Sequence, residues 1–354
     1  MLWVEISPKL EQTFSKENSN LPTNNILKEV RNRYELFKTP ELQNLARIES
    51  SLLKGARKYF DDKGFIEVIV PHITRATGAC ENISTMFSVD FFGERSYLAQ
   101  TGQLYLETLT PFLKKVCCVG PSFRAEPDAD ERHLTEFPLL EIEFEGDFKQ
   151  LMAHIEGIIF SMISTAWKER REELEFFGID KNYISKFKPP YRKVTYTEAL
   201  NYLTDGYKLN WGDDIKSMHE KHLLNAFGQE PFFLTHWPKP IKFFNMRAND
   251  HDSSIVNSAD LILPFGGEAV GAAERESTYE ALLERLKQSN MLRMLEERGG
   301  SIEDFRWYLD FYKKYGGTLH SGCGIGMNRV TQALIASNDI RACTVFPMNR
   351  VSLL

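Results

Sequence analysis

The stretch that most constrains this chain runs from residue 116 to residue 145 and predicts two strands joined by a charged loop. Side chains alternate in character along both strands, as in a sheet that buries one face. The polar faces carry Ser122, Arg124 and Glu126 in the first strand and Phe137, Leu139, Glu141 and Glu143 in the second. The opposite faces are apolar. We therefore expect a hairpin whose second side presents an arginine, an aromatic ring and carboxylates.

Such a surface is suited to a nucleotide, because a phenylalanine ring stacks on a flat base and a guanidinium binds a phosphate with two hydrogen bonds. Residues 127–133 form a charged loop that would overhang this side of the hairpin. Alternation and charge alone also fit a solvated face on which Arg124 and Glu126 merely balance each other. The two interpretations are separated by the specific string of residues.

That string, FRAE followed by RHLTEF and a strand with paired acids, resembles motif 2 of class II aminoacyl-tRNA synthetases, closest to the asparaginyl and aspartyl branch. A predicted helix from Pro40 to about Lys63, a strand over Phe65–Val70 and Pro71 resemble motif 1, which forms the dimer interface in that family. His320–Leu334 resembles motif 3 and is expected to form a glycine-rich turn entering a helix. The resemblance covers residues 31–350.

The resemblance implies an α+β fold in which a mostly antiparallel sheet is flanked by helices. We assign residues 39–354 to the catalytic domain. Residues 1–38 are polar and weakly patterned, and we interpret them as an extended N-terminal arm with a little helix. The motif 1 element further implies a homodimer.

The resemblance also implies an ATP site and a magnesium site. Adenine would stack on Phe137, the α-phosphate would bind Arg124, and Glu126 would contribute to the same site. The γ-phosphate would lie near Arg132, His133 and Arg329, and we expect Arg124 and Arg329 to be catalytic. Asp260 and Glu268 match carboxylates that hold Mg²⁺ in the family, since this ion takes few protein ligands beside phosphates and water. The resemblance implies these roles for the residues that match the family motifs.

The amino-acid substrate would be bound by Glu81, Gln103, Glu141, Glu274 and Arg275. Aspartyl enzymes of this family pair the substrate carboxylate with an arginine and a lysine, but the lysine position here is Leu106. One cation compensates a buried carboxylate less well than two, which favours asparagine over aspartate. Aspartate remains possible in a reversed orientation, with Glu274 holding the relocated ammonium.

Composition restricts the setting of this chemistry. The net charge of the 354 residues is −6 and no basic run occurs, so no global charge favours nucleic acid. We expect no membrane span, because no apolar stretch is long enough. The five cysteines lack CxxC spacing, which favours a reducing cytoplasm and disfavours a zinc site.

The sequence constrains the acceptor of the activated amino acid less than any other part of the reaction. About forty residues precede motif 1, too few for the OB-fold that reads the anticodon in related synthetases. Together with the acidic balance, this disfavours tRNA and favours an acceptor such as ammonia, as in asparagine synthetases related to this family. The alternatives are an asparagine–tRNA ligase without an anticodon domain and a non-catalytic regulatory paralogue.

Overall fold

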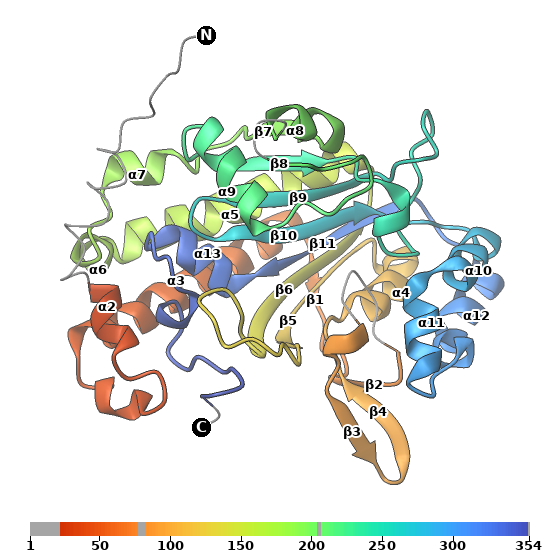
Figure 1. Cartoon of the computed structure of the whole chain (residues 1–354), viewed down its shortest axis with the longest axis horizontal. Coiled ribbons are helices and arrows are strands. Elements are labelled where there is room, and N and C mark those ends of the chain that lie inside the picture. The colour runs from red at the N-terminus through yellow and green to blue at the C-terminus, as the bar shows by residue number, and fades with distance from the viewer. Residues whose placement is uncertain (1–21, 77–82, 204–206, 353–354) are drawn as a thin grey trace.

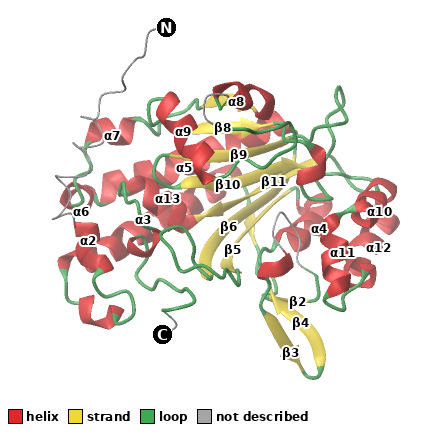
Figure 2. Cartoon of the chain, in the orientation of Figure 1, coloured by secondary structure: helices red, strands yellow, loops and turns green. Residues whose placement is uncertain are grey.

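The computed structural model describes residues 22–76, 83–203 and 207–352 and is built around a central eight-stranded sheet (Figures 1 and 2). The strands follow the order β1-β5-β6-β11-β10-β9-β8-β7. Their bounds are β1 Ile66–Glu67, β5 Lys115–Phe123, β6 Glu136–Glu145, β11 His320–Gly326, β10 Gly267–Glu274, β9 Ser258–Leu263, β8 Phe232–Thr235 and β7 Arg192–Thr195. Only the outer pairs β1–β5 and β7–β8 are parallel. This confirms the predicted mostly antiparallel α+β architecture.

A second, three-stranded sheet is formed by β2 (Ile73–Thr74), β4 (Glu94–Leu98) and β3 (Ser88–Phe91). Its β3–β4 hairpin projects from the body of the molecule (Figure 1). The remaining helices are α2 (Pro22–Leu27), α6 (Arg171–Phe176), α7 (Lys181–Ser185), α8 (Tyr196–Tyr202), α9 (Ser217–Ala226), α10 (Tyr279–Gln288), α11 (Asn290–Glu297) and α12 (Arg306–Tyr315), besides those introduced below. No helix in these ranges is long and apolar enough to cross a bilayer.

The two faces of the large sheet have different partners. One face carries the apolar row Cys117, Ile142, Cys323, Ala272 and Ala259, whose members are neighbours across β5, β6, β11, β10 and β9. This row packs into the main core against α3 (Pro40–Lys63) and α5 (Phe148–Glu169). The other face carries the polar residues of the predicted hairpin, so the apolar core fixes which side chains are left for chemistry.

The predicted helix from Pro40 and the predicted hairpin are confirmed, and capping residues mark the ends of the long helices. The helix from Pro40 ends at Lys63, where Gly64 adopts the left-handed conformation with φ of 72°. Thr39 caps its start, and Asp147 begins α5 with a reciprocal capping box to Gln150. The predicted hairpin forms as β5 and β6, paired from Lys115 to Phe123.

The stretch 279–297 forms two helices, because the extended backbone of Ser289 and its side-chain cap on Leu292 end α10 and start α11. Two expectations require correction. The expected glycine-rich turn at 320–326 is instead strand β11, followed by α13 (Met327–Leu334). The predicted strand over 65–70 is paired as a strand only at Ile66–Glu67.

The predicted arm is described from residue 22 onward, and this part is not extended. It forms α2 and a turn of 3-10 helix at Arg33–Leu36. Ile26 belongs to the main core, and the buried Arg33 donates hydrogen bonds to the carbonyls of Ile26 and Arg341. Residues 22–38 therefore pack as part of the domain that was predicted to start at residue 39.

The closest approach of α3 and α5 generates a stability prediction. A Cβ added at Gly55 would lie 2.6 Å from the Ser161 carbonyl oxygen and 2.7 Å from the Met162 Cα, both backbone atoms that have little room to move. We expect Gly55→Ala to lower the free energy of unfolding by about 1–3 kcal/mol, because overpacking outweighs the gain in helix propensity. Urea unfolding followed by circular dichroism measures this change. Ser50→Ala, at an exposed position of the same helix, is the control, and equal stability of both variants would contradict the expected clash.

Candidate active site

A single cavity of about 1560 Å³ lies over the polar face of the sheet. It brings together most of the predicted site residues from segments far apart in the sequence. These are Gln103, Arg124, Glu126, Arg132, His133, Phe137, Glu141, Asp260, Glu268, Arg275 and Arg329. Two predicted residues are not among them. Glu81 lies outside the described residues, and Glu274 does not line the cavity.

One end of the cavity is formed by the β5–β6 hairpin. Arg124 follows β5, and its guanidinium carbon lies 5.0 Å from the centroid of the Phe137 ring at the start of β6. The backbone N–H of Arg124 donates to the Thr135 carbonyl at 2.8 Å, so the two ends of the loop are joined directly below these side chains. An aromatic ring and a guanidinium in contact present a stacking surface and a phosphate donor at one place.

Arg329 joins two loops of the site. This side chain of α13 donates through Nη1 to the Gly266 carbonyl and through Nη2 to the Arg132 carbonyl, each at 2.8 Å. Burial, followed by the neighbouring charge of Arg132, lowers the pKa of Arg329 to about 10. Arg329 thus fixes the β9–β10 turn against the hairpin loop. This structural task was not anticipated for a residue predicted to bind phosphate directly.

Glu220, which the sequence analysis missed, lies in the same cluster. It projects from α9, and its Oε2 lies 3.7 Å from Nη2 of Arg132. Burial, and after it the charge of Glu268, raises the pKa of Glu220 to about 7. Glu220 is therefore a buried acid beside the arginines of this cluster, and its ionisation is disfavoured by burial and by Glu268.

The predicted magnesium ligands lie on neighbouring strands β9 and β10 and both line the cavity. Asp260 is buried and accepts a hydrogen bond of 2.8 Å from Nζ of Lys242. Burial raises the pKa of Asp260 to about 7 although Lys242 opposes the rise. Within the described ranges no group of three or more His, Cys, Asp or Glu residues is placed to hold a metal. Two carboxylates nevertheless fit a Mg²⁺ that takes its other ligands from phosphates and water.

The other end of the cavity is dominated by Arg275, which follows β10 and is 3% exposed. Its Nη2 and Nε donate to Oε1 of Glu143 on β6 at 2.7 and 3.1 Å. Gly322, on the strand between them, leaves the space for Glu143, because a Cβ there would lie 2.0 Å from the Glu143 carboxyl carbon. Gly322 of β11 therefore makes room for this ion pair.

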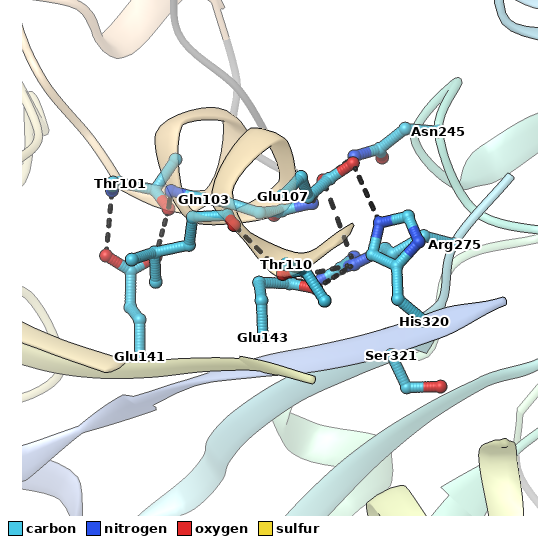
Figure 3. Close-up of polar contacts among 12 residues, drawn as sticks. Thr101, Gln103, Glu107, Thr110, Glu141, Glu143, Asn245, Arg275, His320 and Ser321 are labelled. Atoms are coloured by element: carbon cyan, nitrogen blue, oxygen red, sulfur yellow. Dashed lines mark hydrogen bonds and ion pairs between the residues drawn. The ribbon is translucent and has the colours of Figure 1, made fainter. Parts of the chain in front are cut away.

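Behind Arg275 lies a second buried acid, Glu107 of α4 (Gln103–Leu113), as Figure 3 shows. Oε1 of Glu107 accepts from Gln103 and Asn245 at 2.6 Å each, and Oε2 accepts from Tyr308 at 2.6 Å. Nε of Arg275 is 3.9 Å from Oε1. Burial disfavours its ionisation, but hydrogen bonding to His320 and the charge of Arg275 lower the pKa of Glu107 below its ordinary value. Glu107 is therefore ionised.

Glu141 connects the hairpin to the start of α4. Its carboxylate accepts hydrogen bonds from the Thr101 hydroxyl and from the Gly102 N–H, the latter at 2.7 Å. Burial raises the pKa of Glu141 despite these donors. The predicted amino-acid ligand thus also positions the helix that carries Gln103 and Glu107.

Glu274 is directed to a different part of the structure. Its Oε2 accepts from the backbone N–H of Phe148 at 2.9 Å, and its Oε1 accepts from Asn257 at 3.1 Å. Adjacent residues in a strand point to opposite faces, so Glu274 faces α5 while Arg275 faces the cavity. The prediction that Glu274 holds a substrate ammonium beside Arg275 is therefore not supported by its position.

The missed residues Glu107 and Glu143 left partial signals in the sequence. Glu107 is four residues after Gln103, which places both on one face of a helix. Glu143 shares the strand face of Glu141. Lys242 and Glu220 carried no comparable signal, because their roles depend on strands and loops distant in the sequence.

Comparison with known proteins identifies the family. A family described as tRNA synthetases class II (D, K and N) matches residues 25–350. The asparagine–tRNA ligase of Pyrococcus abyssi is 36% identical over 318 residues, covering 89% of this chain and 70% of the relative. That of Koribacter versatilis is 32% identical over 311 residues, covering 85% and 67%.

Solved structures agree with the sequence relatives. Asparaginyl-tRNA synthetase from Pyrococcus horikoshii, complexed with asparaginyl-adenylate, has a TM-score of 0.84 at 33% identity and covers 92% of this chain and 73% of its own. The Entamoeba histolytica asparaginyl-tRNA synthetase has a TM-score of 0.80 at 26% identity, covering 98% and 76%. The chain therefore belongs to the class II tRNA synthetases of the D, K and N group and is an adenylate-forming ligase.

Proposed function

We propose that this chain activates asparagine at its α-carboxylate with ATP and transfers the asparaginyl group to tRNA. The relatives named above are asparagine–tRNA ligases, and one solved relative is complexed with asparaginyl-adenylate. The observation in this structure that carries the choice of asparagine is the pair of buried acids, Glu143 and Glu107, beside Arg275.

The charge of Arg275 is compensated before any substrate binds. Glu143 is bound to the guanidinium by two hydrogen bonds, and Glu107 lies 3.9 Å away. No second cation is supplied from the lysine position of aspartyl enzymes. Leu106 lies there in an apolar cluster with Val70, Val116 and Cys118. A substrate carboxylate would be buried without net compensation, whereas a neutral amide accepts and donates hydrogen bonds at little electrostatic cost.

The remaining groups suit in-line attack on the α-phosphorus of ATP. The α-carboxylate of the amino acid is already ionised at neutral pH, so no general base is required. Arg124 would stabilise charge on the α-phosphate, and Phe137 would orient the base. Asp260 and Glu268 would hold Mg²⁺, which supplies charge neutralisation to the phosphates when bound.

The acceptor proposed here is tRNA, whereas the sequence alone favoured an acceptor such as ammonia. The preference for ammonia depended on the residues preceding motif 1 and on net charge, and no relative described here supports it. Binding of aspartate in the reversed orientation depended on Glu274 to hold the ammonium. Glu274 instead accepts hydrogen bonds from Phe148 and Asn257. A non-catalytic role is disfavoured by the cavity, which brings Arg124, Glu268 and Arg275 together.

We also propose a homodimer formed through the motif 1 segment. Ile66, Ile69 and Ile73 follow α3 and are 46%, 100% and 43% exposed in the single chain. Three isoleucines exposed within eight residues are costly in water unless they are covered, and a second copy of the same segment would cover them.

The first prediction from this proposal concerns the reaction itself. The wild-type chain is expected to support asparagine-dependent pyrophosphate exchange and to charge tRNA-Asn. Arg124→Ala is expected to lower exchange by about 10²-fold or more, the scale for loss of one preorganised charge stabiliser. Arg171→Ala, which removes an arginine of α6 outside the cavity, is the control. Exchange without charging of tRNA would refute the acceptor and leave the activation step standing.

The second prediction concerns the choice of side chain. Glu107→Gln removes one negative charge beside Arg275 and keeps the shape of the residue. We expect the ratio of kcat/KM for asparagine to that for aspartate to fall by about tenfold or more, since one pKa unit of interaction corresponds to a factor of ten. Glu230→Gln, an exposed acid with the same charge change, should leave the ratio unaltered. An unchanged ratio in Glu107→Gln would remove the electrostatic basis of the asparagine assignment.

The third prediction tests the dimer. Ile69→Asp places a charge at the most exposed apolar position and should shift the chain toward monomer at micromolar concentration. Sedimentation velocity or light scattering distinguishes the two states. Lys181→Asp, at an exposed position of α7 outside the motif 1 segment, is the control. A wild-type chain that is monomeric at these concentrations would refute the dimer.

A further inference from the structure

His320 is a buried histidine whose two ring nitrogens both face hydrogen-bond acceptors. It begins β11 and is 1% exposed. Nδ1 lies 2.7 Å from the carbonyl oxygen of Thr318. A carbonyl oxygen only accepts, so Nδ1 must carry a hydrogen.

The second nitrogen faces the carboxylate that the proposed function uses for selectivity. Nε2 of His320 lies 3.5 Å from Oε2 of Glu107 (Figure 3). The Tyr312 hydroxyl is 3.4 Å from Nε2 and 3.2 Å from the same carboxylate oxygen, and its single hydrogen is best directed to the carboxylate. With that hydrogen committed, Nε2 meets favourable partners only as a donor.

The charges around this histidine come from four other elements. Glu107 projects from α4, Glu143 from β6, and Arg275 follows β10. Tyr308 and Tyr312 of α12 stay neutral, because burial, together with the charge of Glu107, raises the pKa of each well above its ordinary value. Burial raises the pKa of Glu143 to about 7, although the charge and the hydrogen bonds of Arg275 favour its ionised form. When both acids are ionised they face one arginine, and a second positive charge is needed to make the buried group neutral.

We propose that His320 carries this charge as an imidazolium and is a positioning residue that sets the net charge presented to the substrate side chain through Glu107 and Arg275. The inference rests on the proposed activation of asparagine and adds a pH dependence to it. With His320 protonated, two cations balance two anions. With His320 neutral, the group carries one negative charge and opposes a substrate carboxylate more strongly.

The direction of the pH effect follows from the environment. Burial alone disfavours the imidazolium, but the hydrogen bond and charge of Glu107, with a further contribution from Glu143, raise the pKa of His320 above its ordinary value of 6.5. The charged form and its stabilisation are fully present below pH 6.5 and are lost as the pH rises through the raised value. Discrimination against aspartate should increase over that same interval.

The protonation state is measured directly on the wild-type protein with ¹⁵N-labelled histidine. We expect the His320 resonances at pH 6.5 to be those of an imidazolium with both nitrogens protonated. They are identified by their absence in His320→Gln, or by their shift in Glu107→Gln should the first variant fail to fold. A neutral ring with hydrogen only on Nδ1 at this pH overturns the proposal.

The functional arm compares kcat/KM for asparagine and aspartate in pyrophosphate exchange between pH 6 and 9. We expect the ratio to rise by about tenfold as His320 loses its proton. His320→Gln keeps an uncharged donor toward Glu107, and it should shift or abolish the rise of the ratio with pH. Tyr312→Phe removes a neutral hydrogen bond to the same carboxylate and should preserve that rise.

The outcomes separate this inference from the function on which it rests. Absence of exchange with either amino acid refutes the proposed function, while the resonances still report the charge of His320. Exchange with a ratio that is the same in wild type and His320→Gln at every pH overturns the charge-setting role. The wild-type ratio of kcat/KM values can also stay constant with pH because the ring remains protonated throughout. In that case a different ratio in His320→Gln supports the charge-setting role.

Discussion

The ion pair between Arg275 and Glu143 is the interaction on which the arrangement of this site depends. It links β6 to the end of β10 across β11, and it forms where Gly322 leaves room between them. Burying two charges is costly unless geometry and further hydrogen bonds compensate, and removal of one partner would leave the other uncompensated. The pair is therefore a structural constraint, and in the proposed function it also determines which side chain the cavity accepts.

Glu107 connects this ion pair to the helices beside the sheet. Its carboxylate receives hydrogen bonds from α4, α12 and the segment around Asn245. One wall of this end of the cavity is thus attached to the sheet by a polar network in addition to the apolar packing of Leu106. Buried polar networks make an arrangement specific, since any displaced member leaves a polar group without its partner.

Local signals in the sequence predicted the elements that depend on neighbouring residues. The helix from Pro40 to about Lys63 was predicted, and in the structure Thr39 and Gly64 bound it. The alternation in residues 116–145 predicted the hairpin and its two faces. The errors have equally physical causes. Glu274 was placed beside Arg275 although strand alternation directs them oppositely. The glycines of β11 were interpreted as a turn, because the need of Gly322 to leave space for Glu143 is set by a distant strand. Lys242 and Glu220 acquire roles only through tertiary contacts.

Arg329 has a consequence for the thermodynamics of nucleotide binding. Its two bonds to the carbonyls of Gly266 and Arg132 fix the two loops that border the end of the cavity proposed to bind phosphate. The conformational entropy of ordering these loops is then lost when the chain folds and not when ATP arrives. Such preorganisation leaves more of the contact energy available as affinity. A single buried arginine in this way moves part of the cost of recognition from the binding equilibrium into the folding equilibrium.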